Sequence, residues 1–197
     1  KGAFRSGEVT GAQWDDASVG DYSFAGGKDT NASGDYSFAA GYETEARGTF
    51  SFAMGYKAQA SGESSVALGG YSGPGGYPSA SGDGSIAMGS YAYAGGIGSV
   101  AIGYGSGGGN LAAEEDYNVA IGYDVVSQTN NNVIAIGESF TASTDSSFNV
   151  GFGGLDFSVE SGKVSLPQNN TNLTFGDNEQ GNIYYDGNDG KLVIKVT

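Results

Sequence analysis

The stretch Ser37-Phe-Ala-Ala-Gly41 and its copy Ser51-Phe-Ala-Met-Gly55, fourteen residues later, decide the fold of this chain. Other segments repeat the same order of serine, apolar residue, alanine, apolar residue and glycine, the last three loosely, and close at Gly27, Gly69, Gly89, Gly103, Gly122, Gly137 and Gly151. Most of the closing glycines lie 14 residues apart. A period this strict predicts a solenoid of stacked coils. Most solenoid proteins bind a partner or span a distance between other domains.

Side chains alternate between two faces within each repeat. Ser37 and Ala39 share one face of an extended segment, while Phe38 and Ala40 share the other. A second small-residue motif, such as Ala46-Arg-Gly48, comes seven residues after the central alanine in most coils that have no insertion. Each coil is therefore expected to hold two strands joined by two turns, where glycine accepts a positive φ. The predicted fold is all-β, a parallel β-roll of 14-residue coils in which each strand pairs with its copy one coil later.

The repeats divide the chain into three expected parts. Residues 1–19 are expected to form an N-terminal cap, in which Trp14 covers the open end of the roll; a binding role for Trp14 is the alternative. Residues 20–154 form a roll of about nine coils, and residues 155–197 form a C-terminal β module with a hairpin around Asp186-Gly-Asn-Asp-Gly190.

Two insertions interrupt the period, near residues 70–79 and 105–116. Insertions in a solenoid emerge on one face and often carry contacts.

The apolar and alanine positions of the repeats are expected to form the roll core and the contacts between chains. The apolar positions are Phe24, Phe38, Phe52, Val66, Ile86, Val100, Val119 and Ile134. The alanine positions are Ala25, Ala39, Ala53, Ala67, Ala87, Ala101, Ala120 and Ala135.

A single roll this narrow buries few apolar side chains per coil. Their burial is small compared with the conformational entropy that each coil loses on folding. The alanine and glycine face carries little bulk, which suits close approach by another chain. We therefore expect several identical chains to associate along the rod axis. Threefold symmetry is the simplest closed arrangement, and the residues alone leave a dimer open.

Composition excludes several classes of function. A net charge of −14, with 8 basic residues among 22 acidic ones, gives no footprint for nucleic acid or anionic lipid. The chain has no cysteine and no histidine, so thiol nucleophiles, the commonest general base and the commonest metal ligand are missing. No apolar stretch approaches the ~20 residues of a membrane helix, and no membrane insertion is expected.

Ser65-Val-Ala-Leu-Gly69 and Ser99-Val-Ala-Ile-Gly103 resemble the head repeats of trimeric autotransporter adhesins, which repeat Ser-Val-Ala-Ile-Gly with a second Ala-x-Gly half. The resemblance covers Gly20 to Gly154, about two-thirds of the chain. It implies a left-handed parallel β-roll, a homotrimer, and binding to host or environmental surfaces. Similar repeats occur in bacteriophage tail fibres and bacterial surface fibres, so the expected location is extracellular, on a cell surface or in a virion tail fibre.

Such adhesins also carry a heptad stalk and a membrane-barrel anchor, and we expect neither within these 197 residues. A fibre segment or an excised head therefore fits the chain better than a complete autotransporter.

The residue after the closing glycine is a tyrosine in four coils: Tyr42, Tyr56, Tyr104 and Tyr123. Tyr42 and Tyr56 are expected to stack, and exposed tyrosines suit a surface glycan or a protein receptor. The alternative is that stacked rings only stabilise the corner. A second column, Tyr22, Tyr36 and Phe50, has the same two interpretations.

Carboxylates follow the second-half glycine at Asp21, Asp35, Glu63 and Asp83. They are expected to be solvated, since no calcium-loop motif is present, although a bridging cation remains open. We expect no catalytic residue, no metal site and no cofactor.

These observations favour a non-enzymatic, trimeric fibre or adhesin segment that mediates attachment to a surface receptor or glycan. One alternative is a purely structural spacer within a fibre. Another is a polysaccharide-degrading tail spike, which needs two carboxylates facing each other across a cleft. A third, ice binding, is disfavoured because regular outward Thr-x-Thr rows are missing.

Overall fold

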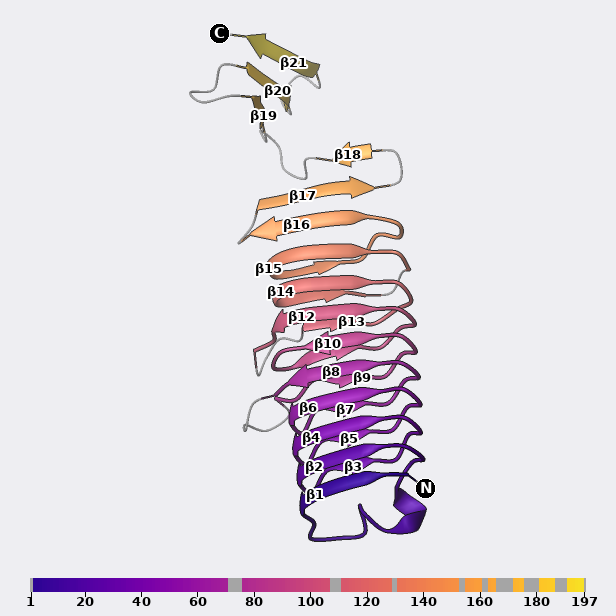
Figure 1. Cartoon of the computed structure of the whole chain (residues 1–197). Helices are drawn as coiled ribbons and strands as arrows, with labels where there is room; N and C mark the ends of the chain where they lie inside the picture. The colour runs from indigo at the N-terminus through magenta and orange to yellow at the C-terminus, as the bar shows by residue number, and fades with distance from the viewer. Residues whose placement is uncertain are drawn as a thin grey trace.

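The computed structural model describes residues 2–70, 76–106, 111–128 and 131–152, together with the backbone of five later strands. In residues 2–152, the described part is a rod of stacked coils, with β1 (Phe4–Glu8) at one end and β16 (Phe148–Phe152) at the other (Figure 1). β1 to β16 belong to one sheet, and their pairings are parallel. The predicted all-β, parallel β-roll is therefore confirmed.

Each coil carries a long strand and a short strand. The long strands between the two ends are β2 (Phe24–Lys28), β4 (Phe38–Tyr42), β6 (Phe52–Tyr56), β8 (Val66–Gly69), β10 (Ile86–Met88) and β12 (Val100–Tyr104). The short strands are β3 (Asn31–Ala32), β5 (Glu45–Ala46), β7 (Gln59–Ala60), β9 (Ser79–Ala80), β11 (Ala92–Ala94) and β13 (Leu111–Ala113). β14 (Val119–Ser127) and β15 (Ile134–Ala142) continue around the corner and form both sides of their coils.

Equivalent repeat positions lie opposite each other in successive coils, both where the offset is fourteen residues and where it is longer, as between Val66 and Ile86 or Val100 and Val119. Phe38 lies opposite Phe52 and Ala39 opposite Ala53 on the long side, while Glu45 lies opposite Gln59 on the short side. Backbone hydrogen bonds join successive coils throughout the described rod; the Phe38 amide, for example, donates to the Ser51 carbonyl at 2.9 Å.

The interior of the roll is made of small side chains. The eight repeat alanines of the long strands are at most 2% exposed, and the alanines of the short strands face them from the other side. The serines that open the repeats are also buried, and the Ser23 and Ser65 hydroxyls donate to the carbonyls of Gly20 and Gly62. We expected the alanine and glycine face to meet another chain; that expectation is wrong for the alanines, because they already fill the space between the two sides of one roll.

The large apolar residues lie on the outside. They form a continuous column on the long strands, which we call the apolar stripe: Phe4, Phe24, Phe38, Phe52, Val66, Ile86, Val100, Val119, Ile134 and Phe148. These side chains are half-buried or exposed, so their assignment to the roll core is corrected. The interior is too narrow for an aromatic ring at every coil, and alternation then places the rings outward.

Two different corners join the strands. At the corner that follows the long strand, Gly41 has a φ of 127° and a Cβ there would lie 2.0 Å from the Gly55 carbonyl oxygen, so both conformation and space require glycine. At the return corner, which precedes the next long strand, the left-handed residue is Tyr36 and not Gly34. Gly34 is needed for space alone, since a Cβ there would lie 2.0 Å from the Gly48 carbonyl oxygen. The expected glycine turn is thus found at the first corner, and at the return corner only where the left-handed residue is Gly84 or Gly98.

The roll begins earlier than expected. β1 lies within the expected cap, yet Phe4 pairs with Phe24 and Arg5 takes the register position of Ala25. Trp14 packs against the buried core, and its indole N–H donates to the Thr30 carbonyl at 2.9 Å. This contact supports a capping role for Trp14, beside the 3₁₀ turn η1 (Asp16–Ser18).

Pairing changes direction after β16. β17 (Leu155–Glu160) pairs antiparallel with β16, and β18 (Lys163–Ser165) pairs antiparallel with β17. β19 (Asn172–Phe175), β20 (Gly181–Asp186) and β21 (Lys191–Val196) form a second, antiparallel sheet. Asp186 lies opposite Lys191, in agreement with the expected hairpin, although residues 187–190 lie outside the described residues.

Candidate functional site

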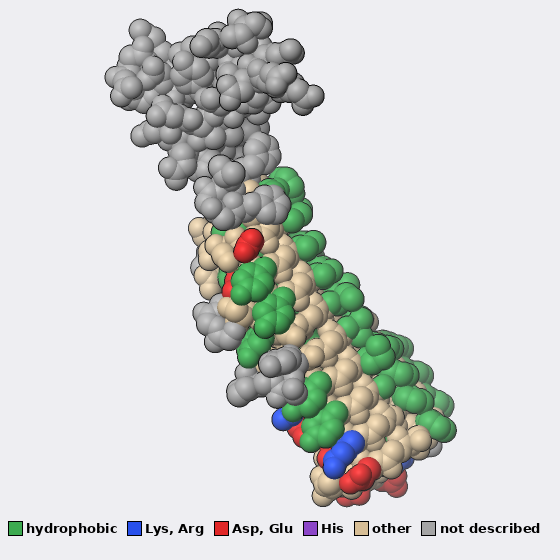
Figure 2. Space-filling model, turned by 90° about the vertical axis from the view of Figure 1, so that its left-hand side faces the viewer, with side chains coloured by type: hydrophobic (Ala, Val, Ile, Leu, Met, Phe, Trp, Pro, Cys, Tyr) green, Lys and Arg blue, Asp and Glu red, His purple; other side chains and the backbone are tan. Residues whose placement is uncertain are grey.

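The four candidate tyrosines all lie at the corner that follows the long strand, which we call the tyrosine corner. Tyr42 stacks on Tyr56 with ring centroids 5.2 Å apart, as predicted, and Tyr104 stacks on Tyr123 at 5.7 Å. The structure therefore brings the four together as two separate pairs. Figure 2 shows hydrophobic side chains in separate groups on the side that faces the viewer, and a column of hydrophobic side chains along one edge of the rod.

Charged groups surround the first tyrosine pair. The Lys57 ammonium lies 2.8 Å from a Glu43 carboxylate oxygen and 5.7 Å from the centre of the Tyr56 ring. Hydrogen bonding to Lys57, and then to Tyr42, holds the pKa of Glu43 below its usual range. The same bond to Glu43 raises the pKa of Tyr42, and Glu43 also raises the pKa of Lys57. This end of the corner is therefore a hydrogen-bonded cluster of fixed charges.

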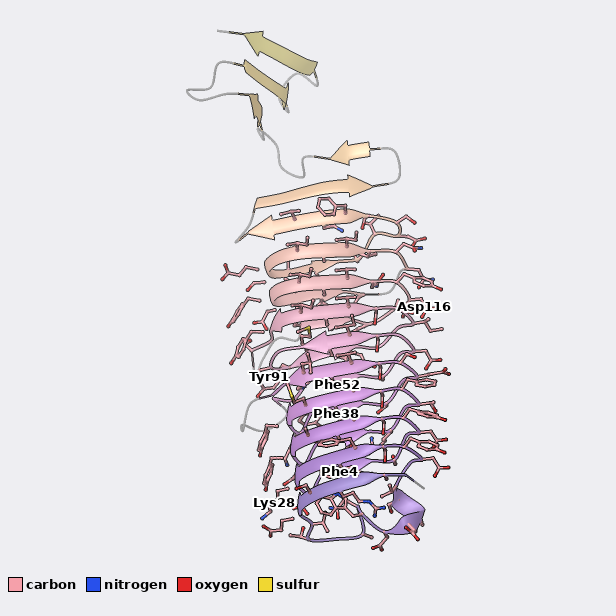
Figure 3. The ribbon with its side chains drawn as sticks, in the orientation of Figure 1. Phe4, Lys28, Phe38, Phe52, Tyr91 and Asp116 are labelled. Carbon is pink, nitrogen blue, oxygen red and sulfur yellow. The ribbon has the colours of Figure 1, made fainter. Side chains whose placement is uncertain are left out.

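A polar groove of 380 Å³ lies beside this cluster. Its lining comes from the N-terminal segment, the tyrosine corner, the short strands β3, β5 and β7, and the segment before β9: Thr10, Gln13, Asp29, Asn31, Glu43, Glu45, Lys57, Gln59 and Tyr77. Figure 3 shows Lys28, the neighbour of Asp29, at this edge of the roll, with Phe38 and Phe52 on the adjoining long-strand face. The groove thus lies around the corner from the apolar stripe.

The carboxylates of the polar groove are already engaged. Asp29 accepts hydrogen bonds from the Thr10 amide at 2.5 Å and the Thr10 hydroxyl at 2.9 Å, and the amide bond is the main reason that its pKa is lowered. Glu45 pairs with Arg47 at 2.5 Å. A glycosidase needs one carboxyl group with a raised pKa to protonate the leaving group. The pKa values of Asp29 and Glu43 are both lowered, so neither carboxyl group has the raised pKa of such an acid.

The insertions occur at the tyrosine corner, inside coils rather than between them. One joins β8 to β9 and the other joins β12 to β13. The second is shorter than expected, because Leu111–Ala113 is a regular strand paired with β11. The parts of the expected insertions at residues 71–75 and 107–110 lie outside the described residues.

The second aromatic column stands at the return corner. Tyr36 stacks between Tyr22 and Phe50, at 5.2 and 5.1 Å, and all three are exposed. Each has a positive φ, between 56° and 58°, a conformation that is costly for an aromatic residue.

The return-corner carboxylates accept hydrogen bonds from backbone amides. Asp35 accepts from the Asp21 amide and Asp83 from the Glu63 amide, both at 2.8 Å, and Asp116 accepts from the Ile97 amide at 2.7 Å. In the part of the chain that the structure describes, no three acidic side chains gather where they could hold a metal ion. These carboxylates therefore have a structural explanation as turn acceptors.

Sequence reasoning missed several groove residues: Thr10, Gln13, Asn31, Glu45, Gln59 and Tyr77. One signal was present, since Asn31, Glu45 and Gln59 lie fourteen residues apart and all carry planar polar groups. Gln13 and Tyr77 come from irregular segments, and no periodicity marks them.

Comparison with known proteins identifies the repeats. Residues 18–44, 46–72 and 80–106 each match the family described as YadA head domain repeat (2 copies). No curated protein matches the chain. Among the described residues, no helix has the length and apolar character to cross a membrane.

The family match agrees with the geometry. The matched residues cover the coils from β2 to β12, whose alanine interior and fourteen-residue register are described above. YadA-type heads are surface-exposed adhesins rather than enzymes. The coils between residues 18 and 106 of this chain are therefore similar to YadA head domain repeats, in agreement with the resemblance that their sequence suggested.

Proposed function

We propose that this chain is a segment of a homotrimeric surface fibre, without enzymatic activity, that attaches to a receptor or glycan on an opposing surface. The observation that carries the proposal is the apolar stripe, which follows the long strands from Phe4 to Phe148 on the outside of a roll whose own interior is filled by alanine. Its location would be extracellular, on a cell surface or in a virion tail fibre.

The stripe has the properties of a buried interface. Phe24, Phe38 and Phe52 stack with centroids 4.6 Å apart and nearly parallel planes. Beside them a second outward column becomes apolar from Met54 onward, with Leu68 next to it in register. A continuous exposed apolar surface on a protein marks an interaction site.

Identical parallel rods cover such a stripe most simply. A stripe that runs along the rod axis meets its own copy along the full length when rods associate around a shared axis. Burial of a large apolar side chain contributes up to about 1.5–3 kcal/mol. Association would thus supply the stability that an interior of alanine and serine lacks. The trimeric state of YadA-type heads favours three copies over two.

Attachment would use the surface that the stripe leaves free. The tyrosine corner carries the pairs Tyr42–Tyr56 and Tyr104–Tyr123, with exposed rings and hydroxyls that suit protein or sugar ligands. Three copies of each pair would give avidity from weak individual contacts.

The test is binding of the fluorescently labelled chain to panels of bacterial and animal cells. We expect saturable binding that is reduced in a variant with all four tyrosines changed to serine. A matched variant at the opposite corner, Tyr22→Ser with Tyr36→Ser, should bind as the unmodified chain does. Native oligomers that bind no surface would contradict attachment and favour the spacer. Release of reducing sugar from polysaccharides would contradict the absence of enzymatic activity.

A further inference from the structure

The polar groove has a periodic floor. Asn31, Glu45 and Gln59 form the floor, one above another on successive short strands. Gln13 from the N-terminal segment and Tyr77, next to the fully buried Pro78, also line the groove. Strands in a sheet lie roughly 4.8 Å apart, so the floor offers a planar polar group at that interval along the rod.

The charges in the groove are largely balanced within it. Lys57 pairs with Glu43, Arg47 pairs with Glu45, and Asp29 accepts two hydrogen bonds from Thr10. A ligand of high charge would have to displace these partners. The remaining groups are amides, hydroxyls and one aromatic ring, and these bind neutral, hydroxyl-rich molecules.

Two amide oxygens at the groove lack a donor, in addition to Glu45 Oε2, whose partner is the ion-paired Arg47. Gln13 Oε1 and Asn31 Oδ1 are buried atoms without a hydrogen-bond partner. A buried acceptor left unpaired costs free energy, which a ligand hydroxyl recovers when the amide turns toward it. The groove therefore favours a ligand with several hydrogen-bond donors.

We propose that the polar groove binds a neutral linear oligosaccharide, whose successive sugar units lie along Asn31, Glu45 and Gln59 and whose end stacks on Tyr77. This proposal rests on the attachment function and assigns its ligand class and site. Planar amide and carboxylate groups bind pairs of sugar hydroxyls, and their repeat along the rod suits a ligand that is itself a repeat.

Two other ligands fit less well. An extended peptide would add to a free strand edge, yet β5 and β7 are paired on both sides by neighbouring coils. A divalent cation needs free oxygen ligands. The groove carboxylates already have protein donors, and the described residues hold no three-acid cluster.

The chain carries a built-in reporter for this site. Trp14 is the single tryptophan, and it follows the groove residue Gln13 and is held to Thr30. Ligand in the groove should change the intrinsic fluorescence of Trp14, while a ligand bound elsewhere on the rod should leave it unchanged.

The experiment titrates the full chain with cellotetraose, chitotetraose, maltotetraose and an unrelated tetrapeptide, by calorimetry and by Trp14 fluorescence. We expect at least one tetrasaccharide to bind with a fluorescence change, and the peptide not to bind. Asn31→Leu and Gln59→Leu should each weaken binding by about tenfold or more, because a ligand hydroxyl is left unpaired.

The matched control is Thr141→Leu, at the same register position as the floor but outside the groove. It should bind as the unmodified chain does. Binding of no tetrasaccharide, binding without a Trp14 change, or equal affinity in all three variants would overturn the proposal. None of these results alters the oligomer mass or the cell attachment by which the proposed function is judged.

Discussion

Gly34 lies against Gly48 of the next coil so closely that a Cβ on Gly34 would stand 2.0 Å from the Gly48 carbonyl oxygen. The same relationship recurs along the return corner, where Gly48 meets Gly62 and Gly62 meets Gly82. At the spacing of the hydrogen-bonded coils the glycine backbones are therefore in direct contact, and a single methyl group at this corner would force two coils apart.

Gly34→Ala should lower the free energy of unfolding by about 3 kcal/mol or more, at the upper end of the cost of overpacking. The control is Gly84→Asn, where φ is 66° and a Cβ would meet no other atom within 4 Å. Asparagine tolerates this conformation, so the control should stay within about 0.5 kcal/mol of the unmodified chain. Denaturant melts at fixed protein concentration measure both, and an equal loss in the two variants would contradict the close contact.

Substitutions at Tyr36 test how much the left-handed backbone conformation of the return-corner aromatic column lowers the free energy of unfolding. Tyr36→Asn and Tyr36→Ala both remove the stacking of Tyr36 on Tyr22 and Phe50. The φ of 56° at this position is unfavourable for alanine, whereas asparagine tolerates it. The asparagine variant should be the more stable by about 1 kcal/mol. Thermal melts compare them, and an alanine variant of equal or greater stability would show that the corner is not strained.

Glu43→Gln should lower the pKa of Tyr42 toward its usual value, because the hydrogen bond to Glu43 is the main cause of the elevation. The pKa of Lys57 should fall in the same variant. Carbon NMR titration of labelled tyrosine measures the first effect. An unchanged Tyr42 midpoint would mean that the hydroxyl does not bond to Glu43.

Acid should selectively remove the contribution of the Glu43–Lys57 pair. The pKa of Glu43 is lowered in the folded chain, so the pair stabilises the fold above the usual glutamate range and loses this effect as the pH falls through the lowered value. The melting temperatures of the unmodified chain and Glu43→Gln should therefore differ at neutral pH and converge below pH about 4. A constant difference across this range would contradict the ion pair.

Variants at Asp83 distinguish two roles for the return-corner carboxylates, as acceptors of backbone hydrogen bonds or as ligands of a cation. Asp83→Asn retains an oxygen for the Glu63 amide, whereas Asp83→Ala does not and should cost about 1 kcal/mol. A chelator should leave the melting temperature of the unmodified chain unchanged. A clear drop on chelation, together with loss of stability in Asp83→Asn, would show that a cation bridges these carboxylates.

The repeat predicted the coil, the strand pairing and the tyrosine stack, because each depends on residues fourteen positions apart. It did not show which face is buried. Alternation separates Phe38 from Ala39 without ranking them, and the distance between the two sides of the roll decides that only alanine fits inside. That distance is a property of the wound coil and becomes visible only in three dimensions.

The start of the roll and the polar groove were missed for related reasons. Phe4–Glu8 has arginine where the other repeats have alanine, so its pattern does not match although its backbone pairs in register. Gln13, Asn31 and Tyr77 are far apart in sequence and meet only because the chain winds. Periodicity predicts contacts between equivalent positions of the repeat. It does not predict where irregular segments fold back onto the roll.

The position of the apolar stripe is the basis of the proposed assembly, and the mass of the native particle tests it most directly. Light scattering at decreasing concentration should give three times the mass of one chain, and Phe38→Asp should dissociate or unfold the particle because a charge then enters the shared interface. A folded monomer that persists at all concentrations with Phe24, Phe38 and Phe52 in water would contradict the account.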